Sequence, residues 1–152
     1  MEQRTALMRE LERYYTLWRE SSAIYEEWAK AHGMSLNDLL VLLALHEEGE
    51  GCTQRQISRK WFLPKQTVNT VLKEFEGQGY LELTPTREDR RAKAIRLTEA
   101  GLAFAGAVDG QLRDLELAVM AQMGLARMKE TNDGLEEFIA LFRQGGGGHG
   151  ES

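Results

Sequence analysis

A run of amide, hydroxyl and ammonium side chains between residues 64 and 74 is the part of this sequence to which chemistry is most readily assigned. The amides of Gln66 and Asn69 can each exchange two hydrogen bonds with an adenine edge. Lysine ammonium groups can hold phosphates or guanine edges, and threonine hydroxyls can bond phosphates or touch thymine methyl groups. In a helix these side chains lie opposite Val68, Val71 and Phe75. The candidate contact residues are Lys65, Gln66, Thr67, Asn69, Thr70 and Lys73.

A second cluster of candidates follows closely and is strongly basic. Arg87, Arg90, Arg91 and Lys93 lie within seven residues, together with Glu88 and Asp89. Arginine is favoured in narrow minor grooves of DNA, where the negative potential is deepest. Taken alone, each cluster is more simply a solvated helix face or a solvated loop, but their succession favours a nucleic-acid contact.

The charge distribution supports the same interpretation. Residues 53–97 hold 10 Lys/Arg against 5 Asp/Glu, whereas the rest of the chain holds 9 Lys/Arg against 19 Asp/Glu. These net charges of +5 and −10 add to the −5 of the whole chain. Basic charge that is concentrated in one compact segment of an acidic protein is typical of a DNA-binding module.

The elements that would position these residues follow from apolar periodicity and from caps. Ser35 with Asp38 and Thr53 with Gln56 predict two capping boxes, and Pro64 suits the first position of a helix. Together the elements predict a mainly α fold with a small β-hairpin wing, a winged helix-turn-helix flanked by long helices. The predicted helices are 5–32, 35–47, 53–60, 64–76, 98–123 and 126–143, and the predicted strands are 80–84 and 94–97.

The first helix carries an apolar seam that predicts a second subunit. About 28 residues of helix extend roughly 40 Å, which is too long for a domain of this size to bury. We therefore expect a dimerisation helix at 1–34, a winged DNA-binding domain at 35–100, C-terminal dimerisation helices at 101–144 and a disordered glycine-rich tail at 145–152. The seam consists of Leu7, Leu11, Tyr14, Trp18, Tyr25 and Trp28, with Ser21 in its gap.

The segment from residue 72 to residue 101 resembles the MarR family of bacterial transcriptional regulators. Asp89-Arg90-Arg91 is similar to the D-x-R of that family's wing tip, and Leu97-Thr98-Glu99-Ala100-Gly101 is similar to the L-T-x-x-G that follows it. Leu72–Leu81 is similar to the end of the family's recognition helix and its first wing strand. In element order the resemblance covers about residues 5–143.

The resemblance implies a homodimer that reads a pseudo-palindromic operator in double-stranded DNA, with no cofactor. It implies that Arg91 enters the minor groove and that Asp89 orients it through a charge-assisted hydrogen bond. It further implies a repressor that is released by a small aromatic effector, bound between the dimer helices and the DNA-binding module. Asp38, where many members carry Gln, is a departure that bears on the effector. Tyr14, Trp18, Tyr25 and Trp28 are candidates for that ligand site, with dimer-core packing as their alternative role.

Several other classes of function fit the sequence less well. It has no phosphate loop, nucleophile elbow or paired histidines, so an enzyme is not expected. His32, His46 and His149 are scattered, so no metal site is expected. The single cysteine, Cys52, is expected to be inert, and it agrees with a cytoplasmic protein, as does the start of the chain without an apolar leader. A winged-helix module that binds protein instead of DNA is the remaining alternative, but it would need an apolar recognition face.

Overall fold

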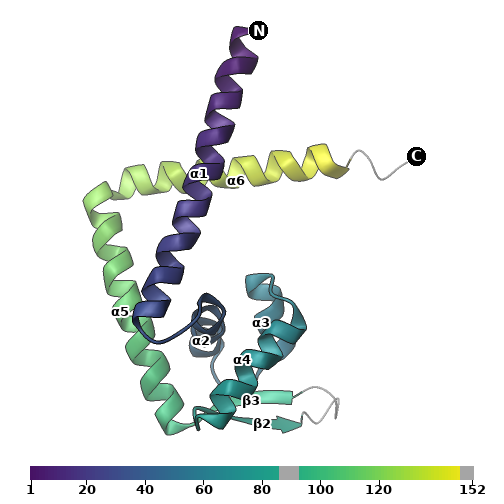
Figure 1. Ribbon diagram of the computed structural model, residues 1–152, viewed down its shortest axis with the longest axis vertical. Coiled ribbons are helices and arrows are strands. Elements are labelled where there is room, and N and C mark those ends of the chain that lie inside the picture. The colour runs from purple at the N-terminus through teal and green to yellow at the C-terminus, as the bar shows by residue number, and fades with distance from the viewer. Residues whose placement is uncertain (86–92, 148–152) are drawn as a thin grey trace. The chain divides into compact units, whose positions relative to one another are not determined.

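The computed structural model describes residues 1–85 and 93–147, with six helices and a small sheet in that part of the chain (Figure 1). The chain divides into two compact units, Met1–Ala107 and the segment from Val108 onward. Within the described residues, no helix is both long and apolar enough to cross a membrane. The elements are α1 (Glu2–Ala31), α2 (Leu36–Glu48), β1 (Cys52–Thr53), α3 (Gln54–Trp61), α4 (Lys65–Gly77), β2 (Leu81–Pro85), β3 (Lys93–Leu97), α5 (Glu99–Met123) and α6 (Leu125–Gly147).

Both capping boxes predicted from the sequence are confirmed. At α2, the Asp38 amide donates to Ser35 Oγ and the Ser35 amide donates to Asp38 Oδ2, each at 3.0 Å. At α3, the Thr53 amide donates to Gln56 Oε1 at 2.8 Å, and the Gln56 amide donates to Thr53 Oγ1 at 3.3 Å. These bonds satisfy amides that have no partner within their own helix, so they fix where α2 and α3 begin.

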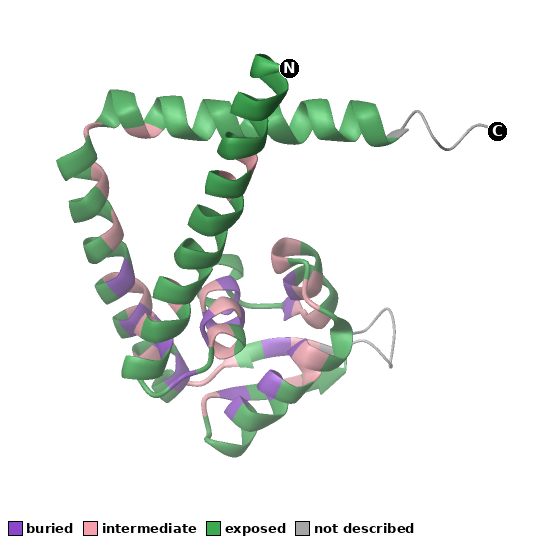
Figure 2. Ribbon diagram, turned by 45° about the horizontal axis from the view of Figure 1, so that its top comes forward, coloured by how far each residue is buried: buried purple, intermediate pink, exposed green. Residues whose placement is uncertain are grey.

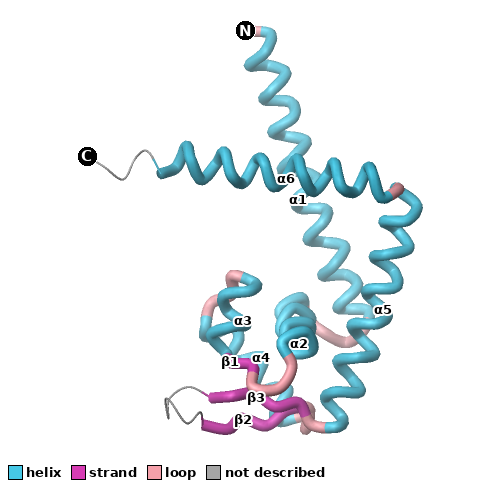
Figure 3. The backbone as a smooth tube through the Cα atoms, turned by 180° about the vertical axis from the view of Figure 1, so that it is seen from behind, coloured by secondary structure: helices cyan, strands magenta, loops and turns pink. Residues whose placement is uncertain are grey.

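The sheet has one strand more than the sequence predicted. Its order is β1-β3-β2, with β3 in the centre and both pairings antiparallel (Figure 3). Cys52 pairs with Ile95 on one side of β3, and Leu83 pairs with Ile95 on the other. Strand β1 has two residues, so it is too short to show the alternation of buried and exposed side chains that marks a strand in a sequence. It is defined only by its pairing with β3.

The core of the first unit lies between α2, α4 and the sheet (Figure 2). Helix α2 is buried in its central part, at Leu39, Val41, Leu42, Ala44 and Leu45, as its apolar run predicted. The buried side chains have relative exposures near zero, and the described residues include no buried charged or polar residue. The largest fully buried side chains are Leu39, Leu42, Leu45, Ile57, Leu72, Leu81 and Ile95.

The segment that resembles L-T-x-x-G forms a tight junction between β3 and α5. Thr98 Oγ1 donates to the Gly79 carbonyl at 2.6 Å and accepts from the Gly101 amide at 3.1 Å, and the Thr98 amide donates to the Tyr80 carbonyl at 3.0 Å. A Cβ on Gly101 would lie 1.9 Å from the Tyr80 carbonyl oxygen, so only glycine fits. The Tyr80 ring stacks on Phe104 with centroids 4.6 Å apart. The junction thus joins the end of the α4 segment to the start of α5.

Helix α6 is continuous, although Gly134 made its continuity doubtful from the sequence. It extends to Gly147, so residues 145–147, which were expected to be disordered, are helical. Glycine disfavours a helix only by about 1 kcal/mol per residue, which continuing an existing helix can offset. Residues 148–152 lie outside the described part of the chain.

Candidate nucleic-acid interface

Helix α4 presents a polar face that is backed by the core. Val68, Val71, Leu72 and Phe75 are buried, as predicted. The polar residues are not equivalent: Lys65, Gln66, Thr70 and Lys73 are exposed, whereas Thr67 and Asn69 are half-buried at the two flanks of the face. The structure therefore brings all six candidate residues to one helix and places Gln66, Thr70 and Lys73 nearest the centre of its exposed side.

The start of α4 is held by the preceding helix. Pro64, predicted as the first helical residue, instead occupies the N-cap with an extended ψ of 144°, and no side chain caps α4. Gln54 Nε2 donates to the Lys65 carbonyl at 2.7 Å, from the first residue of α3 to the first residue of α4. Because the Thr53 capping box already fixes α3, this bond fixes the first turn of α4, which carries Gln66 and Thr67.

Two threonines of α4 face the first turn of α2. A shallow pocket of about 330 Å³ lies between Ser35, Asn37 and Asp38 of that turn and Thr67, Thr70, Val71 and Glu74 of α4. Thr70 Oγ1 also donates to the Gln66 carbonyl at 3.0 Å. That hydroxyl has its proton committed within the helix, so the methyl group of Thr70 is the part most available to an outside contact.

The turn between α3 and α4 has an unusual backbone. Phe62 adopts the left-handed conformation, with φ 53° and ψ 39°, and is the single non-glycine residue with positive φ in the described part of the chain. For an L-residue with a Cβ this conformation costs about 1–2 kcal/mol. The Phe62 side chain is nevertheless 86% exposed.

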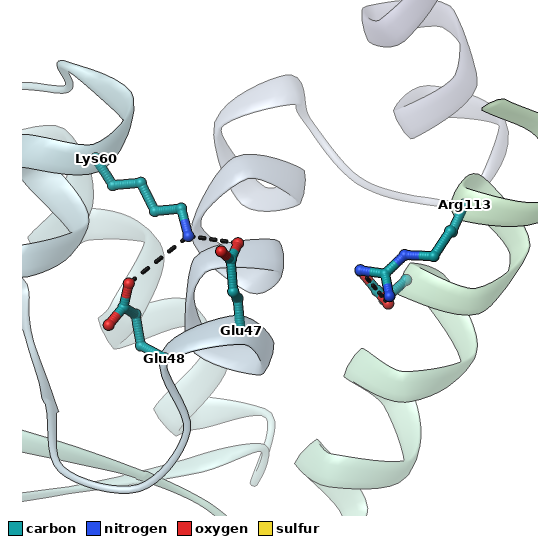
Figure 4. Close-up of polar contacts among 5 residues, drawn as sticks. Glu47, Glu48, Lys60 and Arg113 are labelled. Atoms are coloured by element: carbon teal, nitrogen blue, oxygen red, sulfur yellow. Dashed lines mark hydrogen bonds and ion pairs between the residues drawn. The ribbon is translucent and has the colours of Figure 1, made fainter. Parts of the chain in front are cut away.

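Ion pairs connect α3 to the end of α2 (Figure 4). Lys60 Nζ contacts a carboxylate oxygen of Glu47 and lies 3.6 Å from Glu48 Oε1. The hydrogen bond to Glu47 raises the pKa of Lys60 above its ordinary value, and both glutamates favour the charged ammonium. The charge of Lys60 is thus neutralised locally, so it adds little to the positive field around α4.

The wing tip lies outside the described residues. The candidates Arg87, Asp89, Arg90 and Arg91 fall in that gap, and Lys93 begins β3 without a described side chain. The described base of the wing places Arg96 on β3, where its Nε lies 3.4 Å from Glu50 Oε1. Both partners are largely exposed, so this pair contributes little stability.

The four aromatic ligand candidates are spread along α1. Trp18 is 62% exposed, Tyr14 and Tyr25 are half-buried, and Trp28 stacks on His32 with ring centroids 3.8 Å apart. They do not line the larger pocket, which has a volume of about 670 Å³ and lies where α2, the sheet and the start of α5 meet. That pocket is bounded by Leu45, His46, Gly49, Glu50, Glu82, Ile95, Arg96, Leu97, Thr98, Glu99 and Leu102.

In the part of the chain that the structure describes, Cys52, His32 and His46 belong to no metal-binding cluster. Burial, reinforced by the nearby Glu48 carboxylate, raises the pKa of the Cys52 thiol to about 11. A thiol with that pKa carries almost no thiolate at neutral pH and is a poor nucleophile. Among the described residues, no group of three or more His, Cys, Asp or Glu side chains could hold a metal ion.

Sequence reasoning missed two residues that shape this surface. The sequence predicts a helix that includes Gln54 but not the hydrogen bond from its side chain to the Lys65 carbonyl. Phe62 was placed in the turn without its left-handed backbone, because phenylalanine gives no signal for positive φ. Both effects depend on how α3 and α4 cross, which a local pattern does not contain.

Comparison with known proteins identifies similar sequences and folds. The profile described as "MarR family" matches residues 32–92. A solved MarR family regulator from Neisseria meningitidis is 30% identical, with a TM-score of 0.76 over 89% of this chain and 94% of that one. Streptococcus pneumoniae FabT, solved in complex with DNA, is 18% identical and has a TM-score of 0.71 over 91% of this chain and 98% of its own. That second likeness concerns the fold alone.

A curated relative matches a shorter segment. The HTH-type transcriptional regulator SarZ of Staphylococcus haemolyticus is 30% identical over 88 residues, which are 58% of this chain and 59% of SarZ. The match spans roughly half the length of the first curated relatives.

Proposed function

The chain belongs to the MarR family of transcriptional regulators, which are DNA-binding proteins rather than enzymes, and we propose that it is a homodimeric repressor of transcription. Each subunit reads half of a pseudo-palindromic operator with α4 in the major groove. The observation that carries this proposal is the face of α4, where amides, hydroxyls and ammonium groups stand outward over a packed apolar core. Gln66 and Asn69 read base edges, and Lys65 and Lys73 hold phosphates.

The wing completes the proposed contact with DNA. By the family resemblance, Arg91 enters the minor groove and Asp89 orients it, while Arg87, Arg90 and Lys93 hold phosphates near the wing tip. The two strands at the base of the wing are paired in register from Leu81–Leu97 to Pro85–Lys93, which would hold the tip at a constant distance from α4.

A second copy of the chain is the proposed partner of the terminal helices. Helix α6 exposes Leu135, Phe138, Ile139, Leu141 and Phe142, and α1 exposes Leu7, Leu17, Trp18 and Ile24. A helix with this much exposed apolar surface is not expected to remain folded alone in water. Dimerisation would bury that surface and set the spacing of the two α4 helices on the operator.

An effector would act through that spacing. A ligand that prefers a geometry incompatible with DNA must weaken operator binding by linkage. The exposed aromatic residue Trp18, with Tyr14, Tyr25 and Trp28, forms the candidate surface for a small aromatic effector, and packing in the dimer core is the competing role. Replacing Trp18 with alanine separates the two, because a ligand residue would change effector release while leaving the dimer intact.

The test is fluorescence anisotropy with duplex DNA from upstream of the protein's own gene and with a scrambled duplex, at several salt concentrations. We expect selective binding by two subunits that weakens steeply with salt. Arg91→Ala should lower operator affinity by about 1–3 kcal/mol with the dimer intact. Asn69→Ala should relax sequence preference more than Lys73→Ala does, since amides read bases and lysine holds phosphates.

Equal and feeble binding to every duplex, including those selected from a random pool, would reject this function. The remaining alternative would then be a winged module that binds protein, recognised by salt-independent association with a protein partner.

A further inference from the structure

The end of α3 contains an unusual concentration of unfavourable local features. Phe62 holds a left-handed backbone, which side chains with a Cβ rarely adopt, and its ring is 86% exposed. In the same short stretch, Ser58 Oγ and Trp61 Nε1 are buried without a hydrogen-bond partner among the described residues. All three residues lie between Ser58 and Phe62, just before α4 begins at Lys65.

The fold gains little stability from phenylalanine at position 62. Its ring contributes little to the core, since most of its surface faces water, and glycine would adopt the same backbone without strain. Isolated exposed apolar residues are common and need no explanation, but an exposed aromatic ring on a left-handed backbone is unfavourable twice. Local strain that the fold does not need is often retained at a functional surface.

The position of Phe62 in the chain indicates which surface that is. It lies three residues before Lys65, so its Cα is within about 11 Å of the first residue of α4 along the chain. The major groove is about 12 Å wide. A ring that leaves the turn at this point is therefore within reach of base pairs next to those that α4 would read, provided that α4 enters the groove.

The chemistry of the ring restricts what it can recognise there. A phenyl group has no hydrogen-bond donor and no charge, so it does not bind a phosphate. In the major groove the apolar group that distinguishes one base pair from another is the C5-methyl of thymine, and phenylalanine is one of the side chains that contacts it. Burying the ring against that methyl would remove apolar surface of both partners from water.

We propose that Phe62 is a specificity-determining DNA contact, whose ring packs against a thymine methyl group at the flank of each operator half-site. This inference rests on the proposed DNA-binding function and extends it from the polar face of α4 to the turn before it. We therefore expect that substitutions which relieve the strain at Phe62 keep or raise the stability of the fold but weaken binding to the operator.

The first experiment compares Phe62→Gly, Phe62→Asn and Phe62→Leu with the unchanged protein on a duplex that the unchanged protein selects from a random pool. Glycine and asparagine tolerate the left-handed backbone and remove the ring, whereas leucine keeps an apolar side chain. We expect Phe62→Gly and Phe62→Asn to melt at the same temperature as the unchanged protein or higher. Both should bind the selected duplex about 10-fold more weakly, with affinity for scrambled DNA almost unchanged, and Phe62→Leu should fall between.

Gln78→Ala is the control, because Gln78 is an exposed residue of the same compact unit that follows the last residue of α4 and has no role in the proposed contact or dimer. It should leave the affinity for both duplexes unchanged. An equal loss for selected and scrambled DNA in Phe62→Gly would overturn the proposal, since that result describes a general perturbation of the turn.

The second experiment replaces thymines of the selected duplex one at a time with deoxyuridine, which removes only the methyl group. One position in each half-site should weaken binding of the unchanged protein several-fold and leave Phe62→Gly unaffected. If every replacement acts equally on the two proteins, Phe62 reads no methyl group. If the unchanged protein selects no duplex at all, the proposed function fails together with this inference, whereas selective binding that is indifferent to Phe62 overturns the inference alone.

Discussion

The winged module and the C-terminal helices differ in how much of their own apolar surface they bury. Most of the buried hydrophobic residues lie in the first unit, and only Val108 and Leu112 belong to the segment after Ala107. Within its described residues, α6 has no buried position, although it carries two phenylalanines, an isoleucine and several leucines. The module therefore contains its own core, whereas the apolar side chains of α6 stay exposed in the single chain, as the proposed dimer requires.

This contrast agrees with the proposed regulation, in which the DNA-binding module stays constant and the spacing between the two modules of a dimer varies. Capping boxes, the Gln54 bond and the Thr98–Gly101 junction fix the module internally. In the described part of α6, the Lys129–Asp133 ion pair at 2.7 Å and the Phe138–Phe142 ring contact, with centroids 6.1 Å apart, each join residues of the same helix. A change in the spacing of the two α4 helices would thus move the terminal helices and leave the polar face of α4 unchanged.

The largest effect is expected from a double substitution on α6, Phe138→Asp with Phe142→Asp. Two charges on the proposed interface should dissociate the dimer, and the loss of bivalent binding should weaken operator affinity by about 10²–10⁴-fold. Sedimentation measures the dimer and anisotropy measures the affinity. Glu137→Ala on the same helix is the control and should change neither; a monomer that still binds the full operator tightly would contradict the proposed assembly.

Gly101→Ala tests whether the module depends on its junction with α5. The added Cβ would meet the Tyr80 carbonyl oxygen at 1.9 Å, so the backbone must move, at about 3 kcal/mol of unfolding free energy. Urea unfolding measures this loss. Gly77→Ala is the matched control, since a Cβ there meets nothing within 4 Å, and it should leave stability unchanged or slightly higher.

The pH dependence of the unfolding free energy reports how tightly the core packs around the Cys52 thiol. Its pKa is about 11 when folded and 9.0 ordinarily, so the unfolded chain loses this proton first as pH rises. The contribution of Cys52 to the unfolding free energy is complete below pH 9 and declines between pH 9 and about 11, by about 1–3 kcal/mol in all. Urea unfolding of the unchanged protein and of Cys52→Ala across this range isolates the effect.

A thiol reagent gives an independent measurement of the same burial. At pH 8 the native Cys52 should react at least about 100-fold more slowly than the unfolded chain, because thiolate is the reacting form. Rapid labelling of the folded protein would show that the core around Cys52 opens readily.

The smallest effect is expected at Gln54. Gln54→Leu removes one hydrogen bond to the Lys65 carbonyl and should lower the unfolding free energy by about 1 kcal/mol. Gln54→Glu keeps the length of the side chain but places a carboxylate, which cannot donate, against the Lys65 carbonyl oxygen. This variant should therefore be less stable than the leucine variant at neutral pH. If Gln54 positions α4, both variants should discriminate less between operator and scrambled DNA. The free energy lost in this discrimination should exceed the loss in unfolding free energy.

The sequence by itself determined the elements that depend on local signals. The two capping boxes, the buried stripe of α4 and the apolar run of α2 were predicted because caps and periodicity involve residues within about four positions of one another. The order of these locally defined elements predicted the winged helix-turn-helix, and the family resemblance, carried by short motifs, agreed with it. The polar face of α4 follows from its spacing, so the candidate interface was largely predictable, although its contact with DNA stays a prediction.

Only the tertiary structure decided the features that join distant parts of the chain. Strand β1 exists because Cys52 meets Ile95, and Gln54 holds α4 because the two helices cross with Lys65 within reach. Gly101 is required because the Tyr80 carbonyl lies against it, and Phe62 is left-handed because α3 must turn into α4. Each of these depends on a distance between elements, and such distances are set by how apolar faces pack together, which no local pattern of residues specifies.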